Sequence, residues 1–183
     1  MKFLGLRRIW LILPIILIVV FVFVISGCSQ LSGKESRINK NFSVLVPELK
    51  NRYSKLNEAL TIAENVGGKR DVTSEGKKYL KEFNSAIKKK NVKNQLNAAQ
   101  NLEIVIGRLR ANAKLSNKLV NSKELSDAIR NLDNTEPGSI NMDKYKKSVK
   151  DYESARTSWR LLISAMLGGY SAPQVLEIST SKK

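Results

Sequence analysis

Apolar residues recur at intervals of three and four along most of this chain, and this spacing constrains its fold more than any other feature. In the first stripe, which begins near residue 38, Phe42, Leu45 and Leu49 are followed by further apolar residues at the same intervals up to Ala63. Residues three and four apart lie on one face of an α-helix. Similar stripes cover residues 79–87, 92–113, 125–132 and 142–166.

No stretch of the chain alternates apolar and polar residues for long enough to predict a sheet. Long helical stripes joined by short connections are typical of bundles in which neighbouring helices run in opposite directions. The sequence therefore predicts an all-α fold, a long antiparallel helical bundle of three to four helices behind the N-terminal segment.

Residues that disfavour helix lie between the stripes. We expect Gly67-Gly68 to end the first helix and Ser74 to begin the second. Pro47 lies inside the first stripe and predicts a kink or a restart of that helix. Across residues 88–91 the stripe shifts by one position, which leaves open whether one helix continues with a skip or a break separates two helices.

The second half of the chain has clearer boundaries. Ser122 is a suitable N-cap for the stripe that begins at Leu125. The sequence Thr-Glu-Pro-Gly at residues 135–138 predicts a turn, and Gly168-Gly169 ends the last stripe. The residues that we expect in the core are Leu49, Leu56, Leu60, Leu102, Ile106, Leu109, Tyr145, Val149, Tyr152 and Trp159.

Tyr145 and Tyr152 lie one heptad apart on the stripe that contains Trp159. We expect both rings to pack in the core, with their hydroxyl groups reaching its edge. The alternative is that the aromatic side chains form a platform on which a ligand stacks.

The first 27 residues have the organisation of a secretory signal. Lys2, Arg7 and Arg8 precede residues 9–25, which are apolar throughout. In a helix these 17 residues span about 26 Å, slightly less than the ~30 Å hydrocarbon core of a bilayer, and Pro14 disturbs a permanent helix. Because positive charges hold the N-terminus inside, we expect the rest of the chain on the extracytoplasmic side.

The apolar run ends in Ile25-Ser26-Gly27-Cys28, which resembles the lipobox of bacterial lipoproteins. Small residues before the cysteine let a signal peptidase grip the backbone, and the thiol is the atom that accepts diacylglycerol. This predicts a protein lipid-anchored to the cell membrane; the alternative is an uncleaved transmembrane anchor. The predicted segments are a signal peptide at residues 1–27, lipidated Cys28 with a polar tether at 28–36, the helical bundle at 37–170 and a tail at 171–183.

The composition argues against most kinds of enzyme. The chain has no His and a single Cys, which excludes His-based dyads, Cys–His nucleophiles, zinc clusters and internal disulfides within it. No glycine-rich phosphate-binding motif is present either. We therefore expect no metal and no cofactor, and a non-catalytic scaffold or interaction module. The alternative is an envelope hydrolase that uses two of the 16 acidic residues as a carboxylate pair.

Basic residues are densest between residues 69 and 93, where the sequence contains nine Lys or Arg and only three acids. Cleavage after residue 27 would lower the formal net charge only from +16 to +13, because three basic residues and no acid are lost. The lysines form either a solvated helix face or a surface for anionic lipid or an anionic envelope polymer. The candidate contacts are Lys77, Lys78, Lys81, Lys88, Lys89, Lys90 and Lys93.

Other partners are less well indicated. Nucleic acid is not expected, since the chain has the features of an exported protein and no aromatic-interleaved binding motif. No motif identifies a protein partner.

The second half of the chain contains a series of recognisable motifs. Tyr145 and Tyr152 enclose Val149 and are followed by Trp159 and by Leu-Gly-Gly-Tyr at residues 167–170. Upstream, residues 132–136 have the pattern Leu-x-x-Thr-Glu, and residues 45–49 read Leu-Val-Pro-x-Leu. In order and spacing these motifs resemble those of the LemA family of bacterial envelope proteins, although the Asn that follows each tyrosine in the family is replaced here. The resemblance implies a long antiparallel helical bundle outside or facing the membrane, without catalytic activity.

Overall fold

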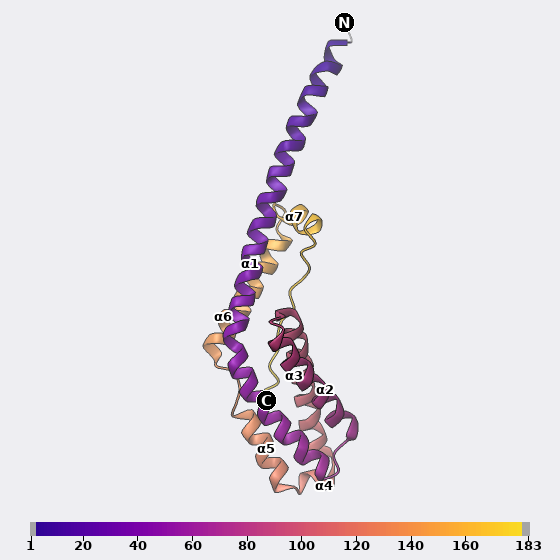
Figure 1. The fold of residues 1–183 in the computed structure, drawn as a ribbon, viewed down its shortest axis with the longest axis vertical. Coiled ribbons are helices and arrows are strands. Elements are labelled where there is room, and N and C mark those ends of the chain that lie inside the picture. The colour runs from indigo at the N-terminus through magenta and orange to yellow at the C-terminus, as the bar shows by residue number, and fades with distance from the viewer. Residues whose placement is uncertain (1–2, 181–183) are drawn as a thin grey trace. The chain divides into compact units, whose positions relative to one another are not determined.

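The computed structural model describes residues 3–180, with side chains from Pro14 onward, and all regular secondary structure in this part of the chain is helical (Figure 1). The prediction of an all-α fold is confirmed. The helices are α1 (Phe3–Asn65), α2 (Arg70–Lys88), α3 (Val92–Leu115), α4 (Asn117–Val120), α5 (Lys123–Asp133), α6 (Ser139–Thr157) and α7 (Leu162–Leu167).

The chain forms two compact units. Unit 1 consists of Met1–Ile38 and Lys147–Pro173, and unit 2 consists of Asn39–Lys146 and Gln174–Lys183. Helices α1 and α6 therefore each contribute one part to unit 1 and the other part to unit 2.

Helix α1 is longer than the sequence predicts. It continues through Pro14 and Pro47, so the restart predicted at Pro47 does not occur. Leu45 and Leu49, on either side of that proline, are fully buried, and their packing compensates for the hydrogen bond that a proline removes. The predicted tether at residues 29–36 is also helical.

The apolar face of α1 begins before the predicted start of the bundle at residue 37. Leu31, in the middle of the predicted tether, is fully buried in unit 1. A single leucine in a polar segment gives little periodic signal, because periodicity needs several apolar residues to be recognised. At its other end α1 stops at Asn65, just before Gly67-Gly68, as predicted.

A break separates α2 from α3, which resolves the alternative left open at residues 88–91. Helix α2 ends at Lys88, and Lys90 has a positive φ of 52°. Asn91 then acts as the N-cap of α3, because its side chain accepts a hydrogen bond from the backbone N–H of Asn94 at 3.0 Å. The other end of α2 lies at Arg70, four residues before the predicted start at Ser74.

The predicted boundaries in the second half of the chain are largely confirmed. The hydroxyl of Ser122 accepts a hydrogen bond from the backbone N–H of Leu125 at 3.3 Å and caps α5. Residues 134–138 separate α5 from α6, where the turn was predicted.

The last stripe, however, is interrupted after Thr157, and α7 begins only at Leu162. Trp159 lies in this interruption with 78% of its surface exposed, so its predicted place in the core is wrong. A residue seven positions after Tyr152 lies on the same helix face only if the helix continues to it. Because α6 ends at Thr157, Trp159 does not stay on that face.

The other nine residues predicted for the core are buried. In unit 2, the rings of Phe42 and Tyr145 lie 5.8 Å apart, and the ring of Tyr53 meets Phe83 edge-on at 4.9 Å. These contacts join α1 to α6 and to α2. The buried set is Leu49, Leu56, Leu60, Leu102, Ile106, Leu109, Tyr145, Val149 and Tyr152.

Both predicted core tyrosines bond through their hydroxyl groups. In unit 2 the hydroxyl of Tyr145 donates to the carbonyl oxygen of Gln174 at 2.9 Å, and in unit 1 that of Tyr152 donates to the carbonyl oxygen of Ser171 at 3.1 Å. Burial raises the pKa of Tyr145 to about 12 and also raises that of Tyr152. These hydroxyl groups therefore stay protonated at neutral pH and serve packing, as the core interpretation expects.

Gly76 allows α2 to approach α1 and α3 closely. A Cβ atom at this position would lie 2.5 Å from Leu60 of α1 and 3.1 Å from Val105 of α3. Both distances are shorter than ordinary contacts between carbon atoms. The α2–α3 hairpin therefore packs tightly against the part of α1 that belongs to unit 2.

We predict that Leu109→Ala lowers the free energy of unfolding by about 2–5 kcal/mol, because it removes buried carbon atoms and leaves a cavity. Leu109 is only 2% exposed, whereas Ile104 on the same helix is 53% exposed. Denaturant unfolding followed by circular dichroism measures the difference. The matched control, Ile104→Ala, is expected to change stability far less; equal losses for the two variants would contradict this description of the core.

Candidate functional site

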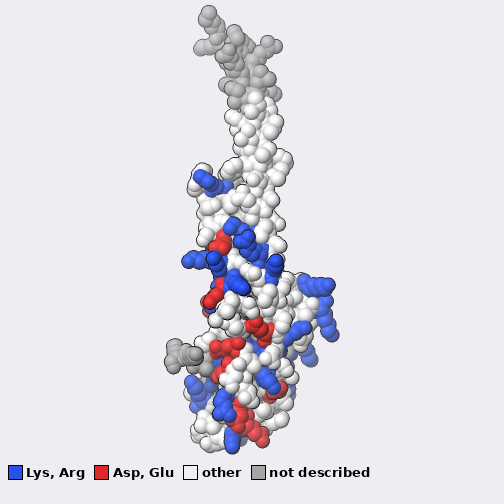
Figure 2. Space-filling model, turned by 90° about the vertical axis from the view of Figure 1, so that its left-hand side faces the viewer, with Lys and Arg blue, Asp and Glu red and all other residues white. Residues whose placement is uncertain are grey.

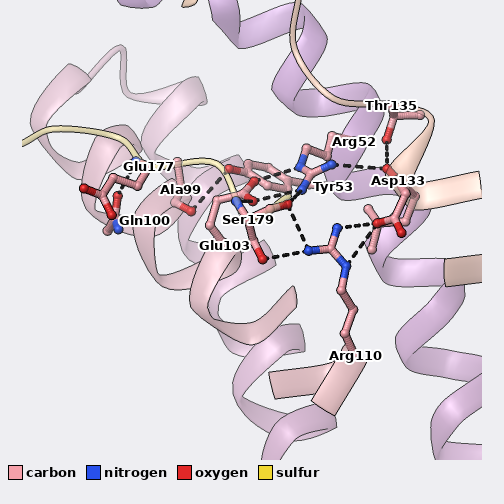
Figure 3. A network of polar contacts seen from close by, with 11 residues as sticks. Arg52, Tyr53, Ala99, Gln100, Glu103, Arg110, Asp133, Thr135, Glu177 and Ser179 are labelled. Atoms are coloured by element: carbon pink, nitrogen blue, oxygen red, sulfur yellow. Dashed lines mark hydrogen bonds and ion pairs between the residues drawn. The ribbon is translucent and has the colours of Figure 1, made fainter. Parts of the chain in front are cut away.

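Unit 2 encloses a buried ion pair between Arg52 of α1 and Glu103 of α3 (Figure 3). Arg52 donates from Nε to Glu103 Oε1 at 2.8 Å and from Nη2 to Oε2 at 3.0 Å. Only 0% and 2% of the two side chains are exposed. Burial by itself lowers the pKa of Arg52, but the hydrogen bond and charge of Glu103 outweigh this and the pKa is raised. Arg52 is therefore charged inside the core.

The same guanidinium group also binds two backbone carbonyl oxygens. Arg52 Nη1 donates to the carbonyl oxygen of Leu132, near the end of α5, at 3.2 Å. Its Nη2 donates to the carbonyl oxygen of Ser179 at 2.9 Å. Arg52 thus connects α1 with α3, with α5 and with the C-terminal segment of unit 2.

The C-terminal segment, part of the predicted tail, packs into unit 2. Leu176 is fully buried there. The backbone N–H of Ser179 donates to Glu103 Oε2 at 2.8 Å, and that of Glu177 donates to Gln100 Oε1 at 3.1 Å. Arg110, which forms an ion pair with Asp133, donates to the carbonyl oxygen of Ser179 at 3.0 Å. These contacts are structural, because every charge in them has a partner.

The seven predicted lysines all belong to the α2–α3 hairpin, which we call the lysine hairpin. Lys77 pairs with Glu64 of α1, and Lys78 lies 3.9 Å from Glu82 in an exposed pair. The remaining five are exposed, and none of them has an acidic partner within ion-pair distance in the described part of the chain. These five are Lys81, Lys88, Lys89, Lys90 and Lys93.

The hairpin turn gathers only some of these charges. Lys88, Lys89 and Lys90 are consecutive at the end of α2, and Lys93 lies in the first turn of α3. Lys77, by contrast, precedes Lys88 on α2, and the two are about 16 Å apart along the helix axis at 1.5 Å per residue. Figure 2 shows one group of basic side chains projecting at the right-hand edge of the view without acidic atoms among them. The structure thus brings together four of the seven predicted lysines.

The apolar segment at the start of α1 is largely exposed where the structure describes its side chains, from Pro14 onward. Among the described residues, one helix, α1, is long and apolar enough to cross a membrane, and the apolar part lies near the N-terminus. The side chains of residues 15–23 are between 48% and 66% exposed. The core helix of a water-soluble protein hides such residues, so this segment is compatible with a membrane anchor or a signal sequence.

Cys28 lies inside α1, within unit 1, and is half-buried. Its thiol donates a weak hydrogen bond to the carbonyl oxygen of Ser164 in α7 at 3.6 Å. The carbonyl oxygen of Cys28 accepts a hydrogen bond from the hydroxyl of Tyr170 at 2.9 Å. The candidate lipid attachment site therefore lies directly against α7.

Two hollows in unit 2 are large enough for a small ligand. One of about 560 Å³ lies between α3, α4 and α5, with Leu125 and Ile129 in its wall. Its single acid, Asp133, is paired with Arg110. The other, of about 570 Å³, lies between α1 and α2 and has lysines but no acid in its wall. Neither hollow contains the carboxylate pair that a hydrolase of this kind requires.

The acids that the fold does bring together lie on the surface. Asp71 and Glu75, one turn apart on α2, both bind Arg108 of α3, and all three side chains are exposed. No group of three or more metal-binding side chains occurs among the residues that the structure describes.

Sequence analysis missed the ion-paired network, although a signal exists. Arg52 lies three residues after Leu49 and four before Leu56, so it belongs to the apolar face of its helix. Glu103 lies four residues after Ala99 and three before Ile106, so it belongs to the apolar face of α3. Opposite charges on the apolar faces of two helices are the pattern that predicts a buried ion pair.

No family model, no curated protein and no solved structure matches this chain. The resemblance to the LemA family therefore rests on the motifs of the sequence.

We predict that Glu103→Leu lowers the free energy of unfolding by about 3–5 kcal/mol, because it leaves the charge of Arg52 buried without a partner. The double variant Arg52→Met, Glu103→Leu is expected to recover much of this loss, since it removes both buried charges. Urea unfolding of the single and double variants measures the two effects.

The matched control is Glu82→Leu, which breaks the exposed pair with Lys78 and is expected to cost about 0–1 kcal/mol. A double variant that is as unstable as the single variant would show that the charge of Arg52 is not the cause.

Proposed function

We propose that this protein is a membrane-anchored, extracytoplasmic lipoprotein of the bacterial envelope that acts as a non-catalytic helical scaffold or interaction module, similar to LemA family proteins. The observation that supports this best is the exposed apolar segment of α1 directly before Cys28. Water solvates so many apolar side chains at a large cost in free energy, about 25 cal/mol per Å². A lipid bilayer removes this cost, either during export before the chain is cleaved or permanently where α1 is retained as the anchor.

The anchor is formed by acyl chains on Cys28 after cleavage of the bond to Gly27. Two or more chains hold a protein stably at a membrane, whereas one chain holds it only marginally. Cys28 is only half-buried, so its side chain is partly accessible. The alternative anchor is α1 itself, retained as a transmembrane helix.

The architecture that we propose for the scaffold is a long antiparallel bundle of three to four helices. The α2–α3 hairpin supports it, because a short turn joins two helices of 19 and 24 residues. The ion pair of Arg52 with Glu103 and the ring contact of Phe42 with Tyr145 support the addition of α1 and α6.

The lysine hairpin is the candidate contact for anionic lipid or an anionic envelope polymer. Five exposed lysines without acidic partners support this proposal, because no ion pair neutralises their charges in the part of the chain that the structure describes. The alternative is that they keep the surface soluble. A hydrolase is less well supported, since Asp71 and Glu75 are occupied by Arg108 and lie outside both hollows.

We predict that Cys28 is the lipidated N-terminus of the mature protein. A fatty-acid analogue fed to cells that express the protein should label the wild type, and Cys28→Ala should remove the label because the acceptor thiol is lost. Ser29→Ala, which changes the next residue and keeps the thiol, is the matched control and should stay labelled. An unlabelled membrane-bound wild type would identify α1 as the anchor, and a wild type that is entirely soluble would contradict membrane anchorage.

We predict that the chain without residues 1–27 binds anionic vesicles through the lysine hairpin. Each charge near an anionic surface contributes about 1 kcal/mol, so replacing Lys88, Lys89 and Lys90 by Gln should weaken binding about 100-fold at low salt. Vesicle co-sedimentation measures it, and circular dichroism verifies that the helices are retained. Added salt should weaken wild-type binding, because it screens the charges.

The matched control replaces three exposed lysines elsewhere in unit 2, Lys114, Lys118 and Lys123, by Gln. It removes the same net charge from a different surface and should bind nearly as well as the wild type. Equal losses for the two triple variants would mean that net charge alone, and not the hairpin, causes the binding.

A further inference from the structure

Residues 158–170 expose an unusually large number of apolar side chains. Trp159, Leu162, Ile163, Met166 and Leu167 are all exposed, within nine consecutive residues. The opposite side of this segment is covered, since Leu161, Ser164 and Ala165 are buried in unit 1. A contiguous apolar patch of this kind on a protein surface marks a site for a partner or a membrane.

The position of this patch is fixed by its contacts with α1. A Cβ atom at Gly27 would lie 2.1 Å from Ser164 Oγ and 3.2 Å from Leu161 Cδ2, so only glycine permits this approach. The hydrogen bonds from the Cys28 thiol to Ser164 and from the Tyr170 hydroxyl to Cys28 hold the middle and the C-terminal end of the segment. Close packing of small residues is also how helices associate inside and beside membranes.

These contacts place α7 beside the residues of α1 that directly follow the apolar run. Ile25 is the last residue of that run, and Cys28 follows about 4.5 Å further along the helix. The headgroup region on each side of a bilayer is about 5–8 Å thick. If residues 9–25 occupy the hydrocarbon, the segment that touches Gly27 and Cys28 lies among the headgroups of the same leaflet.

The chemistry of the segment fits that location. Tryptophan is enriched at the boundary between hydrocarbon and water, and Arg160 lies 5.4 Å from the ring of Trp159, where its charge can reach phosphate. Residues 154–176 contain no acid. A short helix with an apolar face and a basic neighbour sinks about 5–10 Å into the interface.

We propose that residues 158–170 form a membrane-interface element, in which Trp159, Met166 and Leu167 insert among the lipid headgroups beside the anchor. The occupant of the apolar patch is the bilayer that holds α1. This inference rests on the proposed membrane anchorage in the form in which α1 is retained, because it uses Gly27 and residues 9–25, which cleavage before Cys28 would remove. The element fixes unit 1 against the membrane surface rather than leaving it free on a single attachment point.

The test uses the full chain reconstituted in phosphatidylcholine vesicles, whose headgroups carry no net charge, so that the lysine hairpin does not contribute. The chain has two tryptophans, Trp10 and Trp159. In the variant Trp10→Phe, Trp159 is the only tryptophan; we expect blue-shifted emission, quenching by lipids that carry a quencher near the headgroup, and loss of quenching by iodide. In the variant Trp159→Phe, Trp10 reports separately on the anchor, and flotation of the vesicles reports on binding.

Two further variants in the Trp10→Phe background sharpen the result. Met166→Ser with Leu167→Ser should restore iodide quenching of Trp159, because the apolar contact with lipid is lost. The matched control, Leu115→Ser with Val120→Ser, removes two exposed apolar residues of unit 2 and should change nothing.

Three outcomes would overturn the inference. A protein that floats with vesicles while iodide still quenches Trp159 keeps its anchor and lacks the interface element. If neither iodide nor the quencher-carrying lipid quenches Trp159, then protein covers this residue, for example a second copy of the chain. A protein that does not float overturns the anchorage, and the interface element with it.

Discussion

Arg52 makes four hydrogen bonds inside unit 2, and the arrangement of that unit depends on all of them. A charged group in the interior loses several kcal/mol of hydration, which is recovered only when its partners have good geometry. Here the partners are Glu103, the carbonyl oxygen of Leu132 and the carbonyl oxygen of Ser179. They belong to α3, α5 and the C-terminal segment. Unit 2 therefore satisfies this buried charge only when all three segments are in place.

Unit 1 is stabilised by other interactions than the buried ion pair of unit 2. Besides buried apolar side chains such as Leu31 and Tyr152, its contacts are made by small side chains and backbone carbonyl groups around Gly27, Cys28 and Ser164, and no buried ion pair is formed among its described residues. Its surface carries the apolar residues 15–25 and the patch around α7. These apolar surfaces are suited to a nonpolar surrounding, whereas the lysine hairpin of unit 2 is suited to water.

Differences between expectation and structure arise where local rules compete with packing. Pro47 is tolerated within α1 because Leu45 and Leu49 are buried around it, and Leu31 brings the supposed tether into the fold. Trp159 leaves the core because the helix is interrupted after Thr157. The break at residues 88–91 lies where the apolar stripe shifts by one position, which periodicity detects without deciding between a skip and a break.

The sequence by itself determined the all-helical fold, most of the core and the apolar segment before Cys28, because these depend on the spacing and polarity of neighbouring residues. Only the tertiary structure decided that Arg52 pairs with Glu103, that the C-terminal segment packs against α3 and that α7 lies on Gly27. Each of these depends on residues between 51 and 137 positions apart. A charge on an apolar helix face is unfavourable alone and favourable when paired, and the partner is defined only once the helices have packed.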